Sequence, residues 1–216
     1  MPGQPLQYLE LRPLEAADLT EVAGWFRNVA DLACFERAAR LPLSPRGLEQ
    51  AWSDMTGDSR DTGNSWFAIT AETDRLCGIA GLESISPVNR DAVIAIFIEE
   101  SSRRQGLGIR SMALLLDFAF RQIGLNRVTS YYRADNTRSR KLTAQAGFTI
   151  EGRMREAWYA EGRYFDMVAV GVLRAEWEAC RKGLAQKLDA PPRAGFPGAD
   201  SSGWVWPPGP EDPAAE

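Results

Sequence analysis

The chain has 216 residues, of which 44% are hydrophobic and 25% charged, as expected for a globular protein with one domain-sized core. Its formal net charge of −4 argues against binding nucleic acid through a basic face. Because no run reaches the ~18 apolar residues of a membrane span and the first residues lack a signal-peptide pattern, we expect a cytoplasmic protein with neither membrane nor nucleic-acid partners.

Cysteine and histidine usage excludes several chemistries. The three cysteines are odd in number and have no paired spacing, which indicates reduced thiols. The chain has no histidine, so a Ser-His-Asp triad is excluded and a catalytic cysteine would lack its usual base. The same absence argues against a zinc site, and we predict no metal.

The N-terminal part reads as alternating strands and helices. The alternating run at 8–14 predicts a first strand, and Asp18 is expected to begin an amphipathic helix. A second helix is expected at 41–55, followed by a polar loop. The runs 65–70 and 76–82 predict the next hairpin.

A glycine-rich turn joins a strand to a helix in the middle of the chain. The run 92–98 is β-branched, aromatic and almost wholly apolar, so it predicts a central strand buried on both faces. Apolar residues then recur at helical spacing from Met112 to Ile123. Between the two lies Arg103-Arg104-Gln105-Gly106-Leu107-Gly108, whose glycines let the backbone approach a ligand. Because a helix N-terminus favours negative charge, the turn predicts an anion site, most often for phosphate.

The second half continues with further strands and helices. Asn136 is a suitable N-cap for a short helix, and Gly147 falls where a left-handed C-cap is expected. The expected segments are strands at 125–132, 148–153 and 165–170, a hairpin turn at 161–164 and a closing helix at 173–188.

Together these motifs resemble the GCN5-related N-acetyltransferases (GNAT), an acyl-CoA-dependent superfamily. Its pyrophosphate loop has Gln or Arg, two residues, Gly, one residue and then Gly or Ala, and Arg103, Gly106 and Gly108 match those fixed positions. An Asn-x-x-Ser helix start, a Gly-Phe-x-x-Glu-Gly strand and a Gly-x-x-x-Asp hairpin resemble one branch. That branch holds ribosomal-protein N-terminal acetyltransferases, spermidine acetyltransferases and amino-sugar N-acetyltransferases. The resemblance covers about residues 8 to 180.

The resemblance implies an α/β (α+β) fold over a domain at 1–187. Its central sheet would be mixed and mostly antiparallel, with six to seven strands, a splay between the fourth and fifth, and about four to five flanking helices. We expect 188–216, which is rich in Pro and Gly, to be a flexible tail, because it buries too little apolar surface to offset its ordering entropy. The alternative is that Trp204 and Trp206 dock on the domain or on a second subunit.

The implied activity is acetyl-CoA-dependent N-acetyl transfer to a primary amine in a direct ternary complex. The acceptor would be a protein N-terminus, an amino sugar or a polyamine, and residues 25–60 would line its site. The mixed charge of that segment does not favour a polycation. Homodimers are common in this branch, so a homodimer is a further expectation. The rival hypothesis is a non-catalytic acyl-CoA-binding or sensing module.

The same resemblance assigns residues to CoA. Backbone N–H groups of the loop would hold the pyrophosphate, with Arg103 and Arg104 adding charge-assisted bonds, while Arg110 could face phosphate or solvent. The edge of the fourth strand would pair with the pantetheine arm, and Asn136 would reach that arm or serve only as a helix cap. The predicted set is Phe97, Ile98, Glu99, Arg103, Arg104, Gln105, Gly106, Leu107, Gly108, Ile109, Arg110, Asn136 and Ser139.

The sequence offers only a few candidates for the catalytic base and the catalytic acid. Many relatives carry a glutamate early in the fourth strand, near Val93 here, where this chain has no carboxylate. Glu83 is therefore the expected base, the alternative being an exposed loop carboxylate. The family's tyrosine acid corresponds to Thr143, which cannot protonate a thiolate in that role. Ser139 could relay a proton through water, and the alternatives are Tyr131, Tyr132, Tyr159 and Tyr164.

Overall fold

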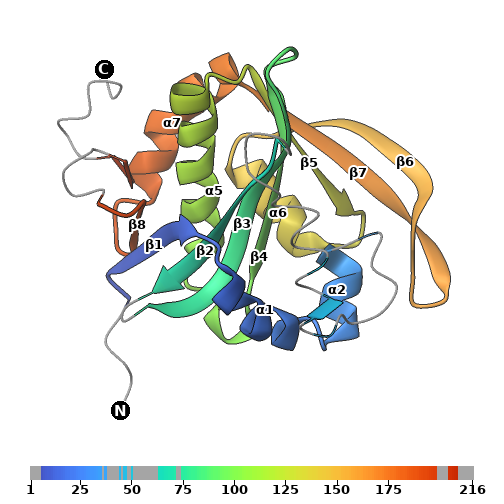
Figure 1. The fold of residues 1–216 in the computed structure, drawn as a ribbon. Helices are drawn as coiled ribbons and strands as arrows, with labels where there is room; N and C mark the ends of the chain where they lie inside the picture. The colour runs from blue at the N-terminus through green and yellow to red at the C-terminus, as the bar shows by residue number, and fades with distance from the viewer. Residues whose placement is uncertain are drawn as a thin grey trace.

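The structure, a computed structural model, describes residues 6–35, 37, 44, 46–47, 50, 63–71, 74–198 and 204–208. Within them, nine strands form one mixed sheet in the order β6-β7-β5-β4-β3-β2-β1-β8-β9 (Figure 1). The strands are β1 (Tyr8–Pro13), β2 (Ser65–Ala71), β3 (Arg75–Ser86), β4 (Asp91–Ile98), β5 (Arg127–Arg133), β6 (Thr149–Ala160), β7 (Arg163–Leu173), β8 (Arg193–Gly195) and β9 (Val205–Trp206). The expected mixed, mostly antiparallel sheet is confirmed, with nine strands rather than six or seven.

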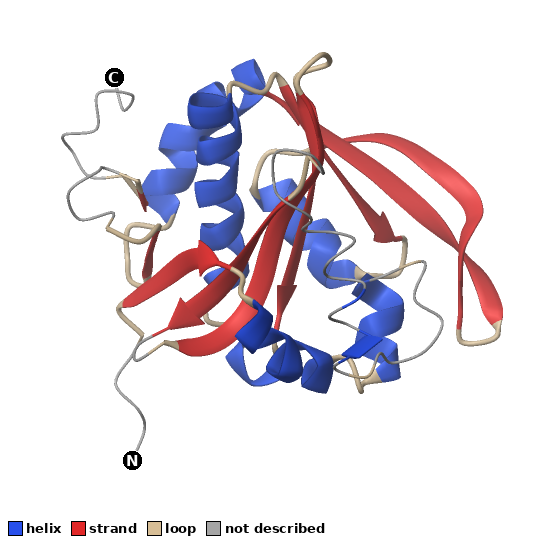
Figure 2. Cartoon of the chain, viewed as in Figure 1, coloured by secondary structure: helices blue, strands red, loops and turns tan. Residues whose placement is uncertain are grey.

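Five α-helices flank the sheet in the described part of the chain (Figure 2). They are α1 (Leu19–Trp25), α2 (Val29–Phe35), α5 (Leu107–Asp117), α6 (Thr137–Gln145) and α7 (Arg174–Lys187), with short helical turns η1 (Ala16–Asp18), η2 (Glu100–Ser102) and η3 (Phe118–Ile123). The helix expected at 41–55 lies outside the described residues, except for positions 44, 46–47 and 50. The sequence did not predict α2 as a separate helix.

The sheet has an apolar layer on each face. Alternate residues of a strand point to opposite faces, and on β3 Ile79 packs with α1 and α2 while Ala80 packs with α5. The α5 layer is the larger, and its helix is buried along almost its whole length. Two-sided burial explains why β4 reads as a nearly continuous apolar run.

The predicted splay lies between β4 and β5. These parallel strands pair only from Asp91 with Arg127 to Val93 with Thr129, although both continue for several residues. At the point of divergence the Ser130 hydroxyl donates to the Ile94 carbonyl at 3.0 Å, which replaces a backbone bond with a side-chain bond. The two strands therefore leave an opening at the centre of the sheet.

The β6–β7 hairpin projects from the body of the molecule (Figure 1), and its residue Trp158 packs against Ala33 of α2. Its register shifts twice, between Ile150 and Gly152 and between Met154 and Trp158. The Trp158 indole N–H donates to the Ala33 carbonyl of α2 at 2.8 Å. This bond places hairpin side chains beside the opening between β4 and β5.

Part of the segment expected to be a tail belongs to the sheet. β8 pairs in parallel with β1, and β9 pairs antiparallel with β8. Trp206 is fully buried, with its ring centroid 5.4 Å from that of Trp177. The flexible-tail expectation does not hold for β8 and β9, because the tryptophans supply the apolar surface that the composition as a whole lacks. β8 and β9 instead fit the alternative expectation, that the tryptophans dock on the domain.

Candidate active site

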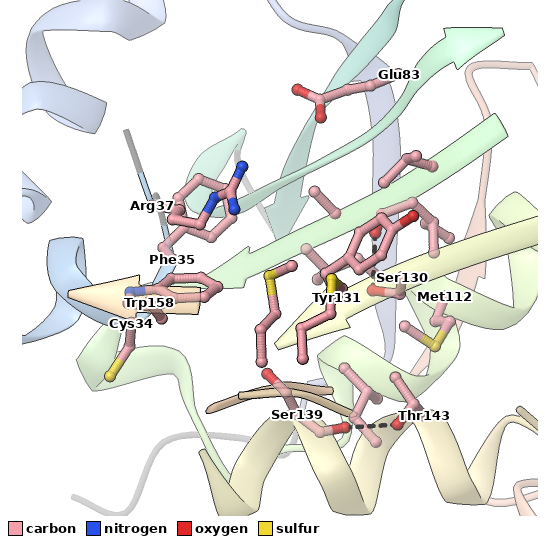
Figure 3. A pocket seen from close by; sticks show the side chains of 17 residues that line it. Cys34, Phe35, Arg37, Glu83, Met112, Ser130, Tyr131, Ser139, Thr143 and Trp158 are labelled. Carbon is pink, nitrogen blue, oxygen red and sulfur yellow. Dashed lines mark hydrogen bonds between the residues drawn. The ribbon is translucent and has the colours of Figure 1, made fainter. Parts of the chain in front are cut away.

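A pocket of about 560 Å³ opens where β4 and β5 diverge (Figure 3). Its wall comes from eight elements that are widely separated in sequence, namely α2, β3, β4, α5, β5, α6, β6 and β7. The lining side chains are Cys34, Phe35, Arg37, Glu83, Val93, Ile94, Ala95, Ile96, Met112, Ser130, Tyr131, Ser139, Leu142, Thr143, Met154, Trp158 and Met167. Both predicted catalytic candidates, Glu83 and Ser139, are among them.

Eleven of these seventeen side chains carry neither a charge nor a hydroxyl group. The pocket is therefore mostly apolar, with a few polar groups placed along it, as is common for sites that bind small molecules.

Glu83 lies on β3, directly opposite Val93 of β4 in the antiparallel register. Directly opposed residues on one face of an antiparallel pair have their Cβ atoms about 5 Å apart. The Glu83 carboxylate is therefore next to the strand-four position where this chain has no glutamate of its own, and both residues line the pocket. The role of Glu83 as base stays a prediction.

Ser139 enters the pocket from the first turn of α6. Asn136 caps this helix by accepting a bond from the Ser139 N–H at 3.1 Å, so its cap function is realised in the structure. The Thr143 hydroxyl donates to the Ser139 carbonyl at 2.9 Å. Thr143 is thus committed to the helix backbone, in agreement with its exclusion as the acid.

The glycine-rich turn forms the N-terminus of α5. Gly106 is the N-cap residue with a φ of 75°, and Arg104 also has a positive φ of 65°. The first-turn N–H groups have no acceptor within their own helix, so they can bind an anion. A Cβ built on Gly108 would lie 3.7 Å from Ile98 and 3.8 Å from Leu142, and Leu142 lines the pocket. The turn therefore lies beside the pocket.

The loop side chains differ from the expectation. The side chains of Leu107 and Ile109 are buried in the core, so only their backbone faces a ligand. Arg103 donates to the Asp31 carboxylate and to the Ile98 carbonyl, each at 2.9 Å, which ties the loop to α2. Arg104 is exposed and Gln105 donates weakly to a backbone carbonyl, which leaves Arg104 as the loop cation without an ion pair in the described part of the chain.

Arg110 is buried behind the glycine turn, where its guanidinium donates to the Gly106 carbonyl at 3.4 Å. Its guanidinium donates to the Leu188 carbonyl at 3.2 Å and to the Ala190 carbonyl at 2.5 Å. Burial lowers the pKa of Arg110 from its ordinary value. Arg110 therefore fastens the start of α5 to the end of α7 and does not face solvent, while its contact with phosphate stays a prediction.

The edge of β4 also differs from the prediction that Phe97, Ile98 and Glu99 would face the pantetheine arm. Phe97 is buried in an aromatic cluster, with its ring centroid 4.6 Å from that of Phe26. The Glu99 N–H donates to the Cys77 carbonyl at 2.9 Å. Burial opposes ionisation of Glu99, but hydrogen bonds from Ser101 and Ser102 together hold the pKa of its carboxyl below the ordinary value. Glu99 is therefore a cap for η2, and Ile96, which the sequence reasoning missed, lines the pocket instead.

The far wall comes from the β6–β7 hairpin and from α2. Met154, Trp158 and Met167 of the hairpin were not singled out from the sequence, whereas Cys34 and Phe35 of α2 lie in the segment 25–60 that was expected to line the acceptor site. Burial raises the pKa of the Cys34 thiol, which keeps it protonated and unreactive. β6 is mostly exposed and its register with β7 shifts twice, so buried and exposed residues do not alternate cleanly along it and its inward-facing positions are not marked.

The described residues include no group of three or more Cys, Asp or Glu side chains placed to hold a metal ion. No helix among them is long and apolar enough to cross a membrane.

A sheet splayed at β4 and β5, with a glycine-rich helix start beside the splay, defines the class of acyl-CoA-dependent acetyltransferases. The model of the acetyltransferase (GNAT) domain matches residues 8–149, so the chain belongs to the GNAT acetyltransferase family. The family predicted from the sequence is confirmed.

The relatives carry related activities in their names. A putative ribosomal N-acetyltransferase of Bacillus subtilis is 33% identical over 103 residues, which cover 48% of this chain and 56% of that protein. The ribosomal-protein-serine acetyltransferase of Escherichia coli is 29% identical over 47% of this chain and 56% of its own length. The spermidine N(1)-acetyltransferase of Escherichia coli is 22% identical over 85% of this chain and 95% of its own length. The chain thus spans little more than half of the two ribosomal-type relatives.

The solved structures confirm the fold. The spermidine N-acetyltransferase of Vibrio cholerae, in complex with CoA and spermine, superposes with a TM-score of 0.70 at 24% identity. The match covers 78% of this chain and 97% of that one. A probable acetyltransferase gives a TM-score of 0.69 at 26% identity, over 81% of this chain and 97% of its own.

Proposed function

We propose that this protein transfers the acetyl group of acetyl-CoA to a primary amine in a direct ternary complex. The observation that carries the proposal is the position of the α5 N-terminus beside a pocket that holds Glu83 and Ser139. In this proposal the backbone N–H groups of the Gly106–Gly108 turn bind the pyrophosphate, and Arg104 adds a charge. The open edge of β4 near Ile96 pairs with the pantetheine arm.

Glu83 is the proposed base and Ser139 a proton relay. The amine must lose a proton before or during attack on the thioester, and a carboxylate that lines the pocket can accept it directly or through water. Fixing the amine and the thioester in one pocket also removes translational freedom, an effect that can reach about 7 kcal/mol or more.

The pocket wall favours an acceptor with one amine. Its described lining holds one carboxylate, Glu83, and one guanidinium, Arg37, among apolar side chains such as Phe35 and Trp158. A polyamine carries several positive charges, and each buried charge needs a partner. We therefore propose a protein N-terminus as the acceptor, ahead of a polyamine or an amino sugar.

Location and assembly belong to the same proposal. Three free cysteines favour a cytoplasmic location. Exposed apolar side chains on the β6–β7 hairpin favour a homodimer that contacts through this hairpin, and they include Ile150, Tyr159 and Tyr164. The rival, an acyl-CoA sensor, would share the donor site but release no thiol.

The first test is thermal unfolding with acetyl-CoA and with free CoA. Ligand at ~100 times its dissociation constant adds about 2.7 kcal/mol to the free energy of unfolding, which raises the midpoint clearly. Gly108→Val should fold, because its Cβ meets neighbours only at 3.7 Å or more, but should abolish the rise by covering the pyrophosphate site. Gly183→Val, at a helical glycine with open space around it, is the matched control and should keep the rise.

An equal rise for the wild type and Gly108→Val would remove the turn from the donor site. Thiol release is then measured with three acceptors: a hexapeptide with a free N-terminal alanine, spermidine and glucosamine. Release with the peptide alone supports the proposed acceptor, and binding without release from any of them supports the sensor.

A further inference from the structure

The proposed reaction needs an acid for the departing thiolate, and the pocket offers four hydroxyl groups for it. They belong to Ser130, Tyr131, Ser139 and Thr143. Ser130 donates to the Ile94 carbonyl at 3.0 Å, and Thr143 donates to the Ser139 carbonyl at 2.9 Å. Each of these two protons is already used in a backbone bond, so neither is available without breaking local structure. The candidates are reduced to Ser139 and Tyr131.

Chemistry separates the remaining two. A thiol has an ordinary pKa of about 8.5 and a phenol of about 10, whereas an aliphatic alcohol is a far weaker acid. Proton transfer is most efficient when the donor and the acceptor have similar pKa values. A phenol therefore suits a departing thiolate, and a serine hydroxyl suits only a relay between stronger acids and bases.

Position favours Tyr131 over the other tyrosines of the second half. Tyr132 is 3% exposed and packed in the core. Tyr159 and Tyr164 pack edge to face on the hairpin, with their ring centroids 5.0 Å apart, and do not line the pocket. Tyr131 is 44% exposed, so its ring borders both the pocket and solvent. The splay frees it, because β5 loses its pairing with β4 at Thr129, two residues earlier.

The backbone of Tyr131 is nevertheless held firmly. On its other side β5 stays paired with β7, where Tyr131 lies opposite Ala169. In the view of Figure 3 the Tyr131 ring lies between Glu83 on one side of the pocket and Ser139 on the other. A base, a phenol and a hydroxyl thus line one opening, on three different elements.

We propose that Tyr131 is the general acid of the acetyl transfer, a role that rests on the proposed function. The amine nitrogen forms a bond to the thioester carbonyl carbon, and its proton goes to the Glu83 carboxylate. The carbon–sulfur bond then breaks, its electron pair stays on sulfur, and the sulfur takes the proton of the Tyr131 hydroxyl. Water returns the proton from Glu83 to the Tyr131 phenolate, which restores both groups, so no other reactant is required.

The test is Tyr131→Phe, which keeps the ring and removes the proton. It uses whichever of the three acceptors named above the wild type acetylates. We expect kcat to fall by about 100-fold or more, as for the loss of a general acid, with the stabilisation by CoA unchanged. Tyr159→Phe, an exposed tyrosine outside the pocket, is the control and should keep its kcat.

The leaving group provides a readout that a structural role would not move. An aryl thioester, 4-nitrophenyl thioacetate, releases a thiolate that is stable without a proton. With this donor, Tyr131→Phe should recover to within about threefold of the wild type, because the missing acid is no longer needed. A loss of equal size with both donors would assign Tyr131 to structure and overturn the proposal.

The remaining outcomes are also decisive. Full activity of Tyr131→Phe with acetyl-CoA would overturn the role of Tyr131 and leave the proposed function intact. No turnover by the wild type with any acceptor would instead overturn the proposed function, and the acid with it.

Discussion

The polar groups on the two sides of the sheet centre have different partners. On the α5–α7 side, the Asp117 carboxylate is 2% exposed and accepts bonds from Trp177 at 2.8 Å and from Arg181 at 2.7 Å. On the β4–β5 side, a pocket opens among polar groups that include Glu83 and Tyr131. One side satisfies its charges internally, and the other presents them to a cavity.

From this difference we expect the α5–α7 side to contribute mainly to stability and the pocket mainly to turnover. A buried charge without its partner is costly, so a change on the α5–α7 side should reduce stability while leaving the pocket intact. A polar group that faces a pocket is partly solvated, so its loss should alter turnover more than folding. The following predictions test this division, from the largest expected effect on stability to the smallest.

Asp117→Ala should have the largest effect. It leaves the Arg181 guanidinium buried at 6% side-chain exposure without its carboxylate, and removing one partner of a buried pair costs about 3–5 kcal/mol. Chemical denaturation measures the loss. Glu151→Gln removes one partner of a half-exposed pair with Arg127 and should cost less than about 1 kcal/mol. Equal losses for the two variants would contradict the division.

The sequence predicted the donor side of the site better than the acceptor side. The turn from Arg103 to Gly108 is continuous in sequence. Its glycines indicate a backbone with positive φ, as Gly106 has, so the turn at the start of a helix could be predicted from the local residues alone. The sequence also singled out Glu83, which lines the pocket, although its position opposite Val93 depends on the register of two strands.

The acceptor wall could not be predicted for physical reasons. Met154 and Trp158 line the pocket in a hairpin that contacts α2 through the bond from Trp158 to Ala33, two residues 125 positions apart, so no local pattern marks them. Arg110 and Arg103 looked like phosphate ligands because charge is visible in a sequence, whereas their partners Ala190 and Asp31 are about 80 and 72 positions away.

Trp206→Ala should have the second-largest effect. The side chain is fully buried against Trp177 and under the Arg181 guanidinium, and a large-to-small change in a core costs about 3 kcal/mol or more. We expect a lower thermal midpoint with kcat unchanged at a temperature where the variant is folded. Trp204→Ala, at a half-buried position, should cost less, and an unchanged midpoint for Trp206→Ala would mean that β9 does not dock in solution.

Asp18→Asn should have the smallest effect, and its pH dependence identifies the cause. The Arg12 guanidinium donates two bonds of 2.8 Å to this carboxylate and thereby lowers the pKa of Asp18. A carboxyl with a lowered folded-state pKa stabilises the fold above its unfolded pKa of about 3.9, and this stabilisation is lost as the pH falls through the folded value. The variant should therefore be less stable than the wild type by about 1 kcal/mol at pH 7, and the gap should close below about pH 4. Because Asp18 does not line the pocket, kcat at pH 7 should be unchanged, and a constant gap across this pH range would assign the difference to packing rather than to charge.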